Sequence, residues 1–289
     1  MLTQNTDEQT DGGTRLKQIG ILYHPLRDKA HNIAAQLQEI LSAEGILTWW
    51  CSTREEKTAR EHCAGTDLVL SIGGDGTILR VARITAVQEI PILGIKLGRL
   101  GFGTELGSEE IIPRLPEIIA GKGWIEERIM LESSLGDEVH HCLNDVVVRG
   151  ATSRLVNVTV YIDDQESMTY RADGMIIATA TGSTGYSLAA GGPILNPQSS
   201  EFIFKPICCH LGPNTALVLS PDSNVQLTLA ETDKALLVID GQIEIPISAG
   251  QSISIKRSPR ITRFLRLRQR GYFYKTLWQN LKLPGASQK

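Results

Sequence analysis

The chain has 289 residues, 42% of them hydrophobic, and a formal net charge of −3 at pH 7. This length provides for a sizeable core and for two domains, and the slightly acidic balance argues against a general nucleic-acid-binding protein, which is usually basic. No apolar run approaches the roughly 20 residues that span a bilayer, so no membrane segment is predicted. Residues 1–14 are polar and lack an apolar stretch; we expect a disordered lead-in and no secretory signal there.

Cysteine usage favours a reducing compartment. The five cysteines are odd in number and have no metal-ribbon spacing, which is typical of free thiols in a cytoplasmic protein. The triplets at 140–142 (His-His-Cys) and 208–210 (Cys-Cys-His) are candidates for a zinc site. Because neighbours in a strand point to opposite faces, buried or edge-strand residues are the preferred interpretation, and no metal ligand is predicted among them.

The first half of the chain alternates apolar runs with helical patterns. Residues 19–23 form an apolar run typical of a buried strand, and residues 29–43 have helical spacing that ends at Gly45. Further strands are predicted at 68–72 and 91–95, with a helix at 78–86 between them. Strands that alternate with helices indicate a parallel sheet covered by helices, so we expect residues 15–124 to form an α/β domain.

After Trp124 the sequence becomes rich in strands. Strand patterns occur at 143–148, 156–162, 168–170, 226–229, 235–240, 243–247 and 252–255, and Asp163-Asp164-Gln165 is typical of a hairpin turn. We therefore expect residues 125–270 to form a mostly antiparallel, β-rich domain, with the active site in a cleft between the two domains.

The end of the chain carries a basic stretch and an amphipathic segment. Arg266 and Arg268 alternate with Leu265 and Leu267, which predicts a strand with one solvated face and not a nucleic-acid surface. Residues 272–283 have a helical pattern, and we expect residues 271–289 to pack back on the first domain.

The sharpest local feature is Gly-Gly-Asp-Gly-Thr at 73–77, between an apolar strand and a helix. Glycines allow positive φ and close approach of the backbone to a ligand, and a helix N-terminus attracts phosphate. Phosphates repel an aspartate, so its presence here indicates a function. Asp75 is placed to accept a proton from a hydroxyl nucleophile or to help hold a magnesium ion. The alternative is a βα turn in which Asp75 only caps the helix.

Two further features have the character of a ligand site. The segment 179–193 is dense in glycine and hydroxyl side chains and carries Tyr186, which makes a poor core and a good cradle for phosphate or sugar oxygens. Asn144-Asp145 lies at the start of an apolar strand, where it can bond an adenine or ribose edge. Turn chemistry for the first and an ordinary loop for the second are the alternatives.

In order and spacing these motifs resemble those of the NAD kinase family. The resemblance covers residues 19–278 and rests on the segments at 73–77, 97–102, 144–145, 173–193 and 240–242. The first is shared with the related diacylglycerol and sphingosine kinases, whereas the Asn-Asp pair and the long loop are specific to NAD kinases. The resemblance implies transfer of a phosphoryl group from ATP, another nucleoside triphosphate or polyphosphate to the 2′-hydroxyl of the adenosine ribose of NAD, which gives NADP.

The resemblance also implies roles for individual residues. Asp75 is implied to accept the proton of the 2′-hydroxyl, with Mg²⁺ or another divalent cation as cofactor and a homodimer or homotetramer as the assembly. The residues implied to lie at the substrates are Asp75, Gly76, Arg80, Phe102, Asn144, Asp145, Arg154, Arg171, Asp173, Thr184, Gly185, Tyr186, Ser187, Leu188, Ala189 and Gln242.

The sequence departs from the family pattern in places that bear on substrate preference and not on the reaction. Lys96 stands where asparagine is common, and residues 179–186 read Thr-Ala-Thr-Gly-Ser-Thr-Gly-Tyr where Thr-Pro-Thr-Gly-Ser-Thr-Ala-Tyr is usual. Two alternative functions are a lipid kinase that shares the glycine motif and a non-catalytic, NAD-binding regulatory protein. The small, polar loop at 179–193 argues against the first, and Asp75 argues against the second.

Overall fold

The computed structural model describes residues 14–98, 101, 103–271, 273 and 277. Phe102, nearly all of the predicted lead-in and most of the predicted helix at 272–283 lie outside the described residues. The chain divides into two compact units. Unit 1 comprises the described residues up to Val81, residues 90–125 and those from Phe264 onward, and unit 2 comprises Ala82–Glu89 and Glu126–Arg263.

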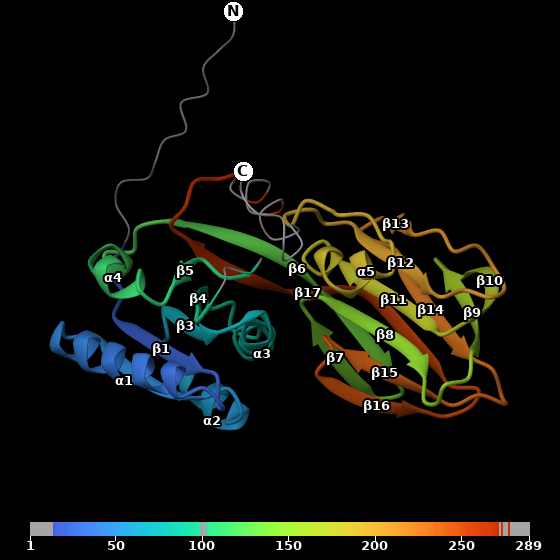
Figure 1. Ribbon diagram of the computed structural model, residues 1–289, viewed down its shortest axis with the longest axis horizontal. Helices are drawn as coiled ribbons and strands as arrows, with labels where there is room; N and C mark the ends of the chain where they lie inside the picture. The colour runs from blue at the N-terminus through green and yellow to red at the C-terminus, as the bar shows by residue number, and fades with distance from the viewer. Residues whose placement is uncertain (1–13, 99–100, 102, 272, 274–276, 278–289) are drawn as a thin grey trace, which may run out of the picture. The chain divides into compact units, whose positions relative to one another are not determined.

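Unit 1 is built on a parallel sheet (Figure 1). Its strands pair in parallel in the order β2-β1-β3-β4-β5, with β1 at Gln18–Tyr23, β2 at Leu47–Ser52, β3 at Leu68–Gly73, β4 at Ile92–Lys96 and β5 at Leu106–Gly107. All six residues of β3 are buried, as expected of a central parallel strand covered on both faces. The predicted strands at 19–23, 68–72 and 91–95 are confirmed to within a residue or two.

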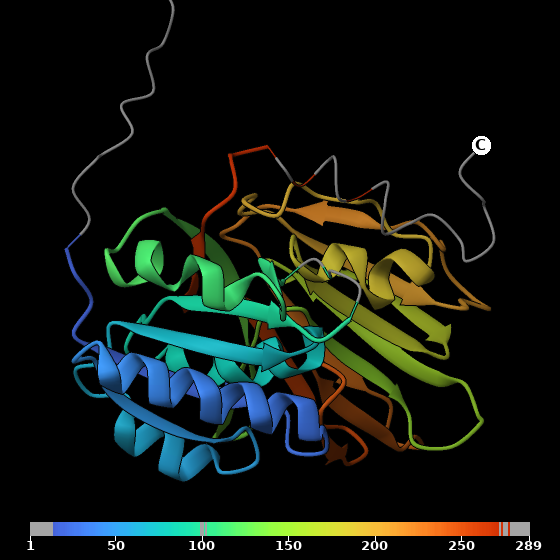
Figure 2. The same cartoon turned by 60° about the vertical axis from the view of Figure 1, so that its left-hand side comes forward.

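Three helices connect the strands from β1 to β4: α1 at Asp28–Ala43, α2 at Glu56–His62 and α3 at Asp75–Thr85. A fourth, α4 at Ile111–Ile119, follows β5. Helices α1 and α4 lie against the same face of the sheet (Figure 2), where their apolar side chains share one core with alternate residues of β1, β3 and β4. Helix α3 begins in unit 1 with the glycine motif, and its last four residues, from Ala82, belong to unit 2. The predicted α/β half is therefore confirmed.

Unit 2 is a β-rich domain of two antiparallel arrays. One sheet has the order β13-β12-β11-β8-β15-β16, formed by Leu217–Leu219, Phe202–Ile207, Gly174–Thr179, Asp145–Gly150, Ala235–Ile239 and Ile243–Ile247. The other array has the order β10-β9-β14-β17, formed by Gln165–Ala172, Val156–Ile162, Asn224–Leu229 and Ser252–Arg266, with β6 (Trp124–Leu135) and β7 (Glu138–Cys142) attached. Alternate apolar residues of both arrays form one core.

The hairpin predicted at 163–165 is confirmed, and its turn explains the acidic residues there. Asp163 and Asp164 connect β9 to β10 and have φ values of 53° and 61°. Positive φ at both central residues defines the two-residue turn that matches strand twist, and aspartate tolerates this conformation better than most residues.

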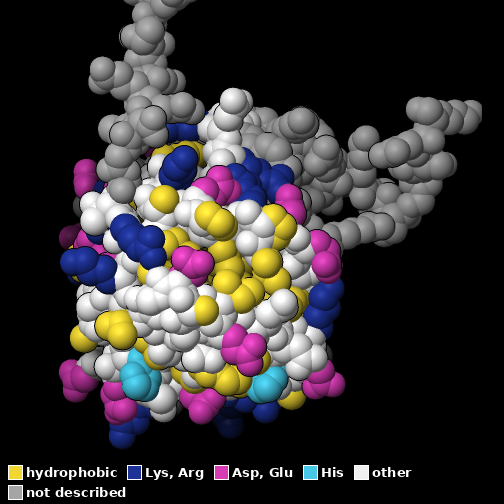
Figure 3. Space-filling model, turned by 90° about the vertical axis from the view of Figure 1, so that its left-hand side faces the viewer, with side chains coloured by type: hydrophobic (Ala, Val, Ile, Leu, Met, Phe, Trp, Pro, Cys, Tyr) yellow, Lys and Arg dark blue, Asp and Glu magenta, His cyan; other side chains and the backbone are white. Residues whose placement is uncertain are grey.

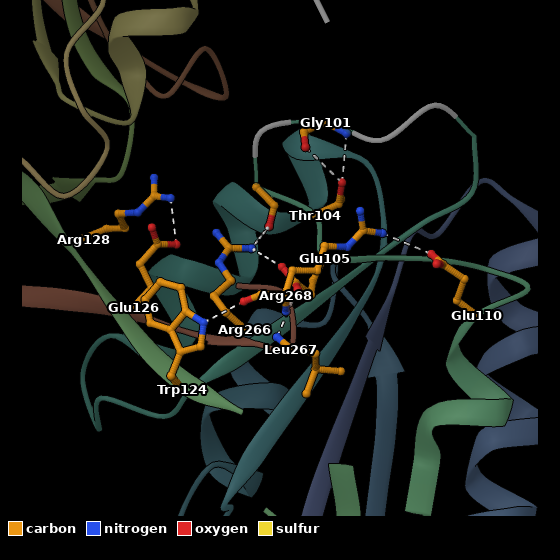
Figure 4. Close-up of polar contacts among 11 residues, drawn as sticks. Gly101, Thr104, Glu105, Glu110, Trp124, Glu126, Arg128, Arg266, Leu267 and Arg268 are labelled. Carbon is orange, nitrogen blue, oxygen red and sulfur yellow. Dashed lines mark hydrogen bonds and ion pairs between the residues drawn. The ribbon is translucent and has the colours of Figure 1, made fainter. Parts of the chain in front are cut away.

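The solvated face predicted for residues 265–268 is wrong at Arg266. This side chain is only 7% exposed and its Nη1 lies 3.3 Å from Oε2 of Glu105, which is 5% exposed (Figure 4). Glu105 Oε1 also accepts the backbone N–H groups of Leu267 and Arg268, at 3.0 and 2.8 Å. Alternation alone does not reveal this, because the partner carboxylate lies far away in the sequence.

On the face shown in Figure 3, acidic, basic and apolar side chains are interspersed, and neither sign of charge covers this face. Within the part of the chain that the structure describes, no helix is long and apolar enough to cross a membrane.

Removal of the Glu105 carboxylate should strongly destabilise the protein. Glu105→Ala leaves the buried Arg266 without this counter-ion and two backbone N–H groups without this acceptor, a loss that costs about 3–5 kcal/mol in comparable buried pairs. Urea unfolding measures the change. Glu109→Ala is the control, because Glu109 pairs with Lys29 at the exposed surface, and its midpoint should match the wild type. Equal midpoints for both variants would contradict the role given to Glu105.

Candidate active site

The glycine motif forms a tight turn between β3 and α3. The backbone N–H of Gly74 donates to Thr77 Oγ1 at 3.3 Å, and Thr77 N–H donates back to Gly74 O at 2.9 Å. A Cβ at Gly73 would overlap the Thr77 side chain, so this glycine is required for close packing. The expected positive φ is not found at Gly73 or Gly74, and the close approach of the backbone is what the motif provides.

Asp75 is the first residue of α3 and its carboxylate is half-exposed. Lys96, at the end of β4, places Nζ 3.8 Å from Asp75 Oδ2. Gly101 lies so close that a Cβ there would overlap the Asp75 carboxylate oxygens. A carboxylate open to solvent, beside a cation and at a helix N-terminus, is suited to take a proton from a hydroxyl group while phosphate is bound nearby.

Further positive charge gathers at the carboxyl ends of β1 and β2. These ends are adjacent, since Thr53 N–H donates to Tyr23 O at 3.0 Å. Burial, followed by the charges of Arg27, Arg80 and Arg54, lowers the pKa of His24. Ligands of parallel sheets bind at this edge. Of these three arginines, only Arg80 was predicted from the sequence as a site residue. Arg27 and Arg54 could have been found from their positions just after the ends of β1 and β2.

Unit 2 contains a cavity of about 380 Å³ beside the Asn-Asp pair. Asn144, Asp145 and Tyr186, all predicted site residues, line it together with Asp240 and Gly241. Its remaining lining residues are Val147, Arg149, Val238 and Glu244. A concave site with apolar walls and a few converging polar groups is typical of a small-molecule or cofactor pocket.

The polar loop is fixed against the Asn-Asp pair by hydrogen bonds and close packing. Thr179 Oγ1 donates to Leu143 O at 2.6 Å, and Thr179 N–H donates to Asn144 O at 2.9 Å. A Cβ at Gly182 would overlap the backbone of Asn144. The loop continues as a 3₁₀ turn at Gly182–Thr184 and the short helix α5 at Tyr186–Ala189.

Arg128 anchors the start of this loop and was not identified from sequence. It is 6% exposed, its Nη1 donates to Thr181 Oγ1 at 3.2 Å, and its Nη2 donates to Glu126 Oε2 at 2.8 Å (Figure 4). Buried charges are retained only when paired in this way.

The remaining predicted residues of unit 2 lie in different places. Gln242 follows β15 and accepts from Arg83 Nη2 at 2.8 Å. Arg154, Arg171 and Asp173 are exposed and do not line the cavity. Asp173 N–H donates to Ile207 O, and Gly150 N–H donates to Asp173 O, so Asp173 lies at the opposite end of β8 from Asp145.

Within the loop, Thr184, Leu188 and Ala189 are at least partly accessible to solvent, as are Gly185 and Tyr186. Ser187 is fully buried, and its hydroxyl has no hydrogen-bond partner among the described residues. Gly76 is exposed in the first turn of α3.

The environment of Asp145 differs from that of Asp75. Asp145 is 6% exposed. Burial, and secondly the neighbouring carboxylate of Asp240, raise the pKa of Asp145 to about 7. In the part of the chain that is described, no group of three or more His, Cys, Asp or Glu side chains is arranged to hold a metal ion.

A glycine turn that presents a carboxylate at a helix N-terminus, together with a nucleotide-sized pocket on a β domain, defines a phosphotransferase of the class that acts on a hydroxyl group. Two family models match the chain: the ATP-NAD kinase N-terminal domain over residues 27–123 and the ATP-NAD kinase C-terminal domain over residues 143–267. Among curated relatives, the NAD kinase of Dehalococcoides mccartyi (strain CBDB1) is 44% identical, with 92% of this chain and 96% of the relative covered. The NAD kinase of Chloroflexus aggregans is 40% identical, with 92% and 99% covered.

Solved structures agree on the fold. Yeast NADH kinase complexed with NADH has a TM-score of 0.80 at 22% identity, with 95% of this chain and 91% of that chain covered. An NAD kinase from Archaeoglobus fulgidus in complex with ATP has a TM-score of 0.73 at 25% identity, with 91% and 97% covered. The chain belongs to the NAD kinase family, and it is a phosphotransferase that acts on NAD; these matches give no support to a lipid kinase or to a non-catalytic regulator.

Substitution at Gly101 should lower turnover by displacing Asp75. Gly101→Ala places a methyl group on the carboxylate oxygens, and a displacement of about 1 Å at a reacting group can cost about 10²-fold in rate. Gly98→Ala is the matched control, because none of the described atoms beyond the neighbouring residues lies within 4 Å of a Cβ at Gly98. NADP formation by the purified variants measures kcat. The interpretation fails if both variants turn over at the wild-type rate.

Proposed function

We propose that this chain transfers the terminal phosphoryl group of ATP to the 2′-hydroxyl of the adenosine ribose of NAD, with Asp75 as the proton acceptor. The observation that carries the proposal is the half-exposed Asp75 carboxylate at the start of α3, 3.8 Å from Lys96 Nζ. Phosphoryl transfer depends on positioning and on neutralisation of charge more than on covalent chemistry. Lys96 and the N-terminus of α3 supply positive charge for the phosphates, and Asp75 supplies the base.

A divalent cation fits this arrangement. Magnesium in kinases is commonly held by one or two carboxylates together with the substrate phosphates, so Asp75 alone among the site's side chains is sufficient as a protein ligand. When bound, the ion would neutralise charge on the phosphoryl group during transfer. The arginines near His24, at positions 27, 54 and 80, would attract the rest of the phosphate chain, whether it belongs to ATP or to inorganic polyphosphate.

The NAD molecule is assigned to the cavity of unit 2. Asn144 offers a donor and an acceptor, Asp145 offers acceptors for ribose hydroxyls, and Tyr186 offers an aromatic face for a base. Thr184 to Ala189 and Gln242 complete the nucleotide site in this proposal. The cleft between the two domains, where both substrates are expected to meet, stays a prediction.

A homo-oligomer is part of the proposal, and the position of Asp173 supports it. Asp145 and Asp173 lie at opposite ends of β8, whose six residues span about 20 Å. If both aspartates contact the same part of NAD in one site, one copy of the chain cannot supply both. Copies related by symmetry can bring the Asp173 of one to the Asp145 site of another. Free thiols at all five cysteines are compatible with the proposed cytoplasmic location.

Asp75→Asn should lower kcat for NADP formation by about 10² or more, the usual scale for loss of a general base. The KM for NAD should change far less, because the dinucleotide is assigned to unit 2. The control is Asp67→Asn, which alters a carboxylate that accepts the backbone N–H groups of Lys17 and Gln18 away from the site. Near-full turnover by Asp75→Asn would show that the carboxylate is neither the base nor the metal ligand, and would leave Asp75 as a helix cap only.

Subunit complementation tests the proposed assembly. Asp145→Ala and Asp173→Ala are each expected to be nearly inactive as pure proteins. Mixed and reassembled, they should recover about a quarter of wild-type activity, because half of the dimers are mixed and each then has one intact site. Steady-state NADP formation after remixing is the measurement, and each variant remixed with itself is the control. If the mixture stays inactive although size-exclusion chromatography shows that subunits exchange, the two aspartates do not serve one site from two copies.

A further inference from the structure

Asp240 receives an unusual number of hydrogen bonds for one buried carboxylate. It follows β15, has a φ of 51°, and its side chain has no solvent exposure. Oδ1 accepts the backbone N–H groups of Asn144 at 2.7 Å and Asp145 at 3.3 Å. Oδ2 accepts the N–H of Leu143 at 3.2 Å and Nη1 of Arg83 at 3.3 Å. Asp240 N–H donates in return to Asp145 O at 2.9 Å.

Arg83 completes this arrangement from the last turn of α3. Its guanidinium is 8% exposed and bridges Asp240 to Gln242, since Nη2 donates to Gln242 Oε1 at 2.8 Å. The planar fork of arginine holds two acceptors at fixed positions, which lysine cannot do equally well. Helix α3, which begins with Asp75, thus carries in its last turn the arginine that contacts Asp240.

We infer that Asp240, held by Arg83, is a positioning residue for NAD: it fixes the backbone of Asn144 and Asp145 so that their side chains point into the nucleotide cavity. The inference rests on the proposed function of that cavity. An ordinary turn would not need a buried charge, because an uncharged side chain can cap backbone N–H groups at a lower desolvation cost. The three N–H groups that converge on Asp240 all belong to residues 143–145.

The same carboxylate contributes, after burial, to the raised pKa of Asp145. Burial and the proximity of Asp240 raise the pKa of Asp145 to about 7. The other ionisable groups that face this pair are Arg83 and the buried Cys142, and burial, then Asp240 and Asp145, raise the pKa of that thiol. Arg149 and Glu244 line the cavity and pair with each other at 2.9 Å. Asp145 accepts hydrogen bonds from ribose best when ionised, so capture of NAD should improve as pH rises through about 7.

Two substitutions should move this pH dependence in opposite directions. Asp240→Asn keeps one acceptor oxygen and removes the charge, so the acid limb of kcat/KM for NAD should move to lower pH by about one pH unit or more. Arg83→Met removes the cation that offsets Asp240, so the limb should move to higher pH. Both should raise KM for NAD by about tenfold or more, with a smaller effect on kcat. Asp240→Asn removes the two hydrogen bonds that one carboxylate oxygen accepts, and Arg83→Met removes the bonds to Asp240 and Gln242.

Arg263→Met is the matched control. Arg263 pairs with Glu89 and Glu127, also within unit 2 but outside the cavity. The acid limb of kcat/KM and the KM for NAD of this variant should match those of the wild type. A second measurement needs no variant: calorimetric titration of NAD into the wild-type protein at pH 7, in two buffers of different ionisation enthalpy, should detect release of about half a proton per NAD bound.

The outcomes separate the inference from the proposed function. Absence of NADP formation by the wild type would overturn the proposed function, whereas the proton release on NAD binding would still test Asp145. If the wild type forms NADP, but Asp240→Asn and Arg83→Met lower the melting temperature and leave both limb and KM unchanged, Asp240 is only structural and the inference is wrong. Should either variant fail to fold, the other variant and the calorimetric result decide.

Discussion

The cost of burying charge is the constraint on which the site depends. Three ion pairs with little solvent exposure occur among the described residues: Glu105–Arg266, Glu126–Arg128 and Arg83–Asp240. Such pairs add little net stability compared with apolar residues of the same size, but loss of one partner is costly because the other remains charged and buried. Each pair here also binds backbone or loop atoms: at Leu267 just after β17, at the polar loop and at the Asn-Asp pair, respectively. Their contribution is therefore to specify where these backbone segments lie.

The two carboxylates proposed to act in the site lie in contrasting surroundings, which suits different tasks. Asp75 is half-exposed and has a lysine ammonium group 3.8 Å away, as expected of a group that must exchange a proton with a substrate hydroxyl. Asp145 is buried beside a second carboxylate, and burial and that neighbour raise its pKa to about 7. A small change of pH or of local charge then alters its ability to accept hydrogen bonds. The first environment suits the proposed role in the reaction, and the second suits the proposed recognition of NAD that depends on protonation.

Local patterns in the sequence were sufficient for much of the fold and for the centre of the site. Strands β1, β3 and β4, the hairpin at Asp163-Asp164 and the placement of Asp75 between β3 and α3 follow from apolar runs and turn chemistry. Strands β2 and β5 of the same sheet were not predicted. Strands β11 and β12 were not predicted: β11 begins at Gly174, and β12 is interrupted by Lys205 and Pro206, residue types that are depleted in central strands. Helix α4 carries Pro116 in its interior, which weakens any helical pattern.

The missed buried ion pairs share a different cause. Arg83 and Asp240 are 157 residues apart in the chain, and Arg266 and Glu105 are 161 apart. No local spacing relates such partners, and each residue alone has the pattern of a solvated charge. Lys96 stood out only as a departure from the family pattern, and its neighbour Asp75 gives that departure a physical meaning. Folding topology, and not composition, brings these charges together.

The polar loop illustrates how a departure in sequence can leave a site intact. The alanine at 180 replaces a usual proline, which would restrict the unfolded chain, yet the loop is held by Thr179, by Arg128 and by the close packing of Gly182 on Asn144. Gly185 is different: a Cβ there would lie 3.3 Å from Gly182 O and 4.0 Å from both Asn144 Nδ2 and Asp145 Oδ2. An alanine, the usual family residue, would thus fit after a shift of a few tenths of an ångström. The glycine leaves that extra space beside Asn144 and Asp145, which line the cavity proposed for the nucleotide, so we expect it to affect the fit of the substrate and not the fold of the loop.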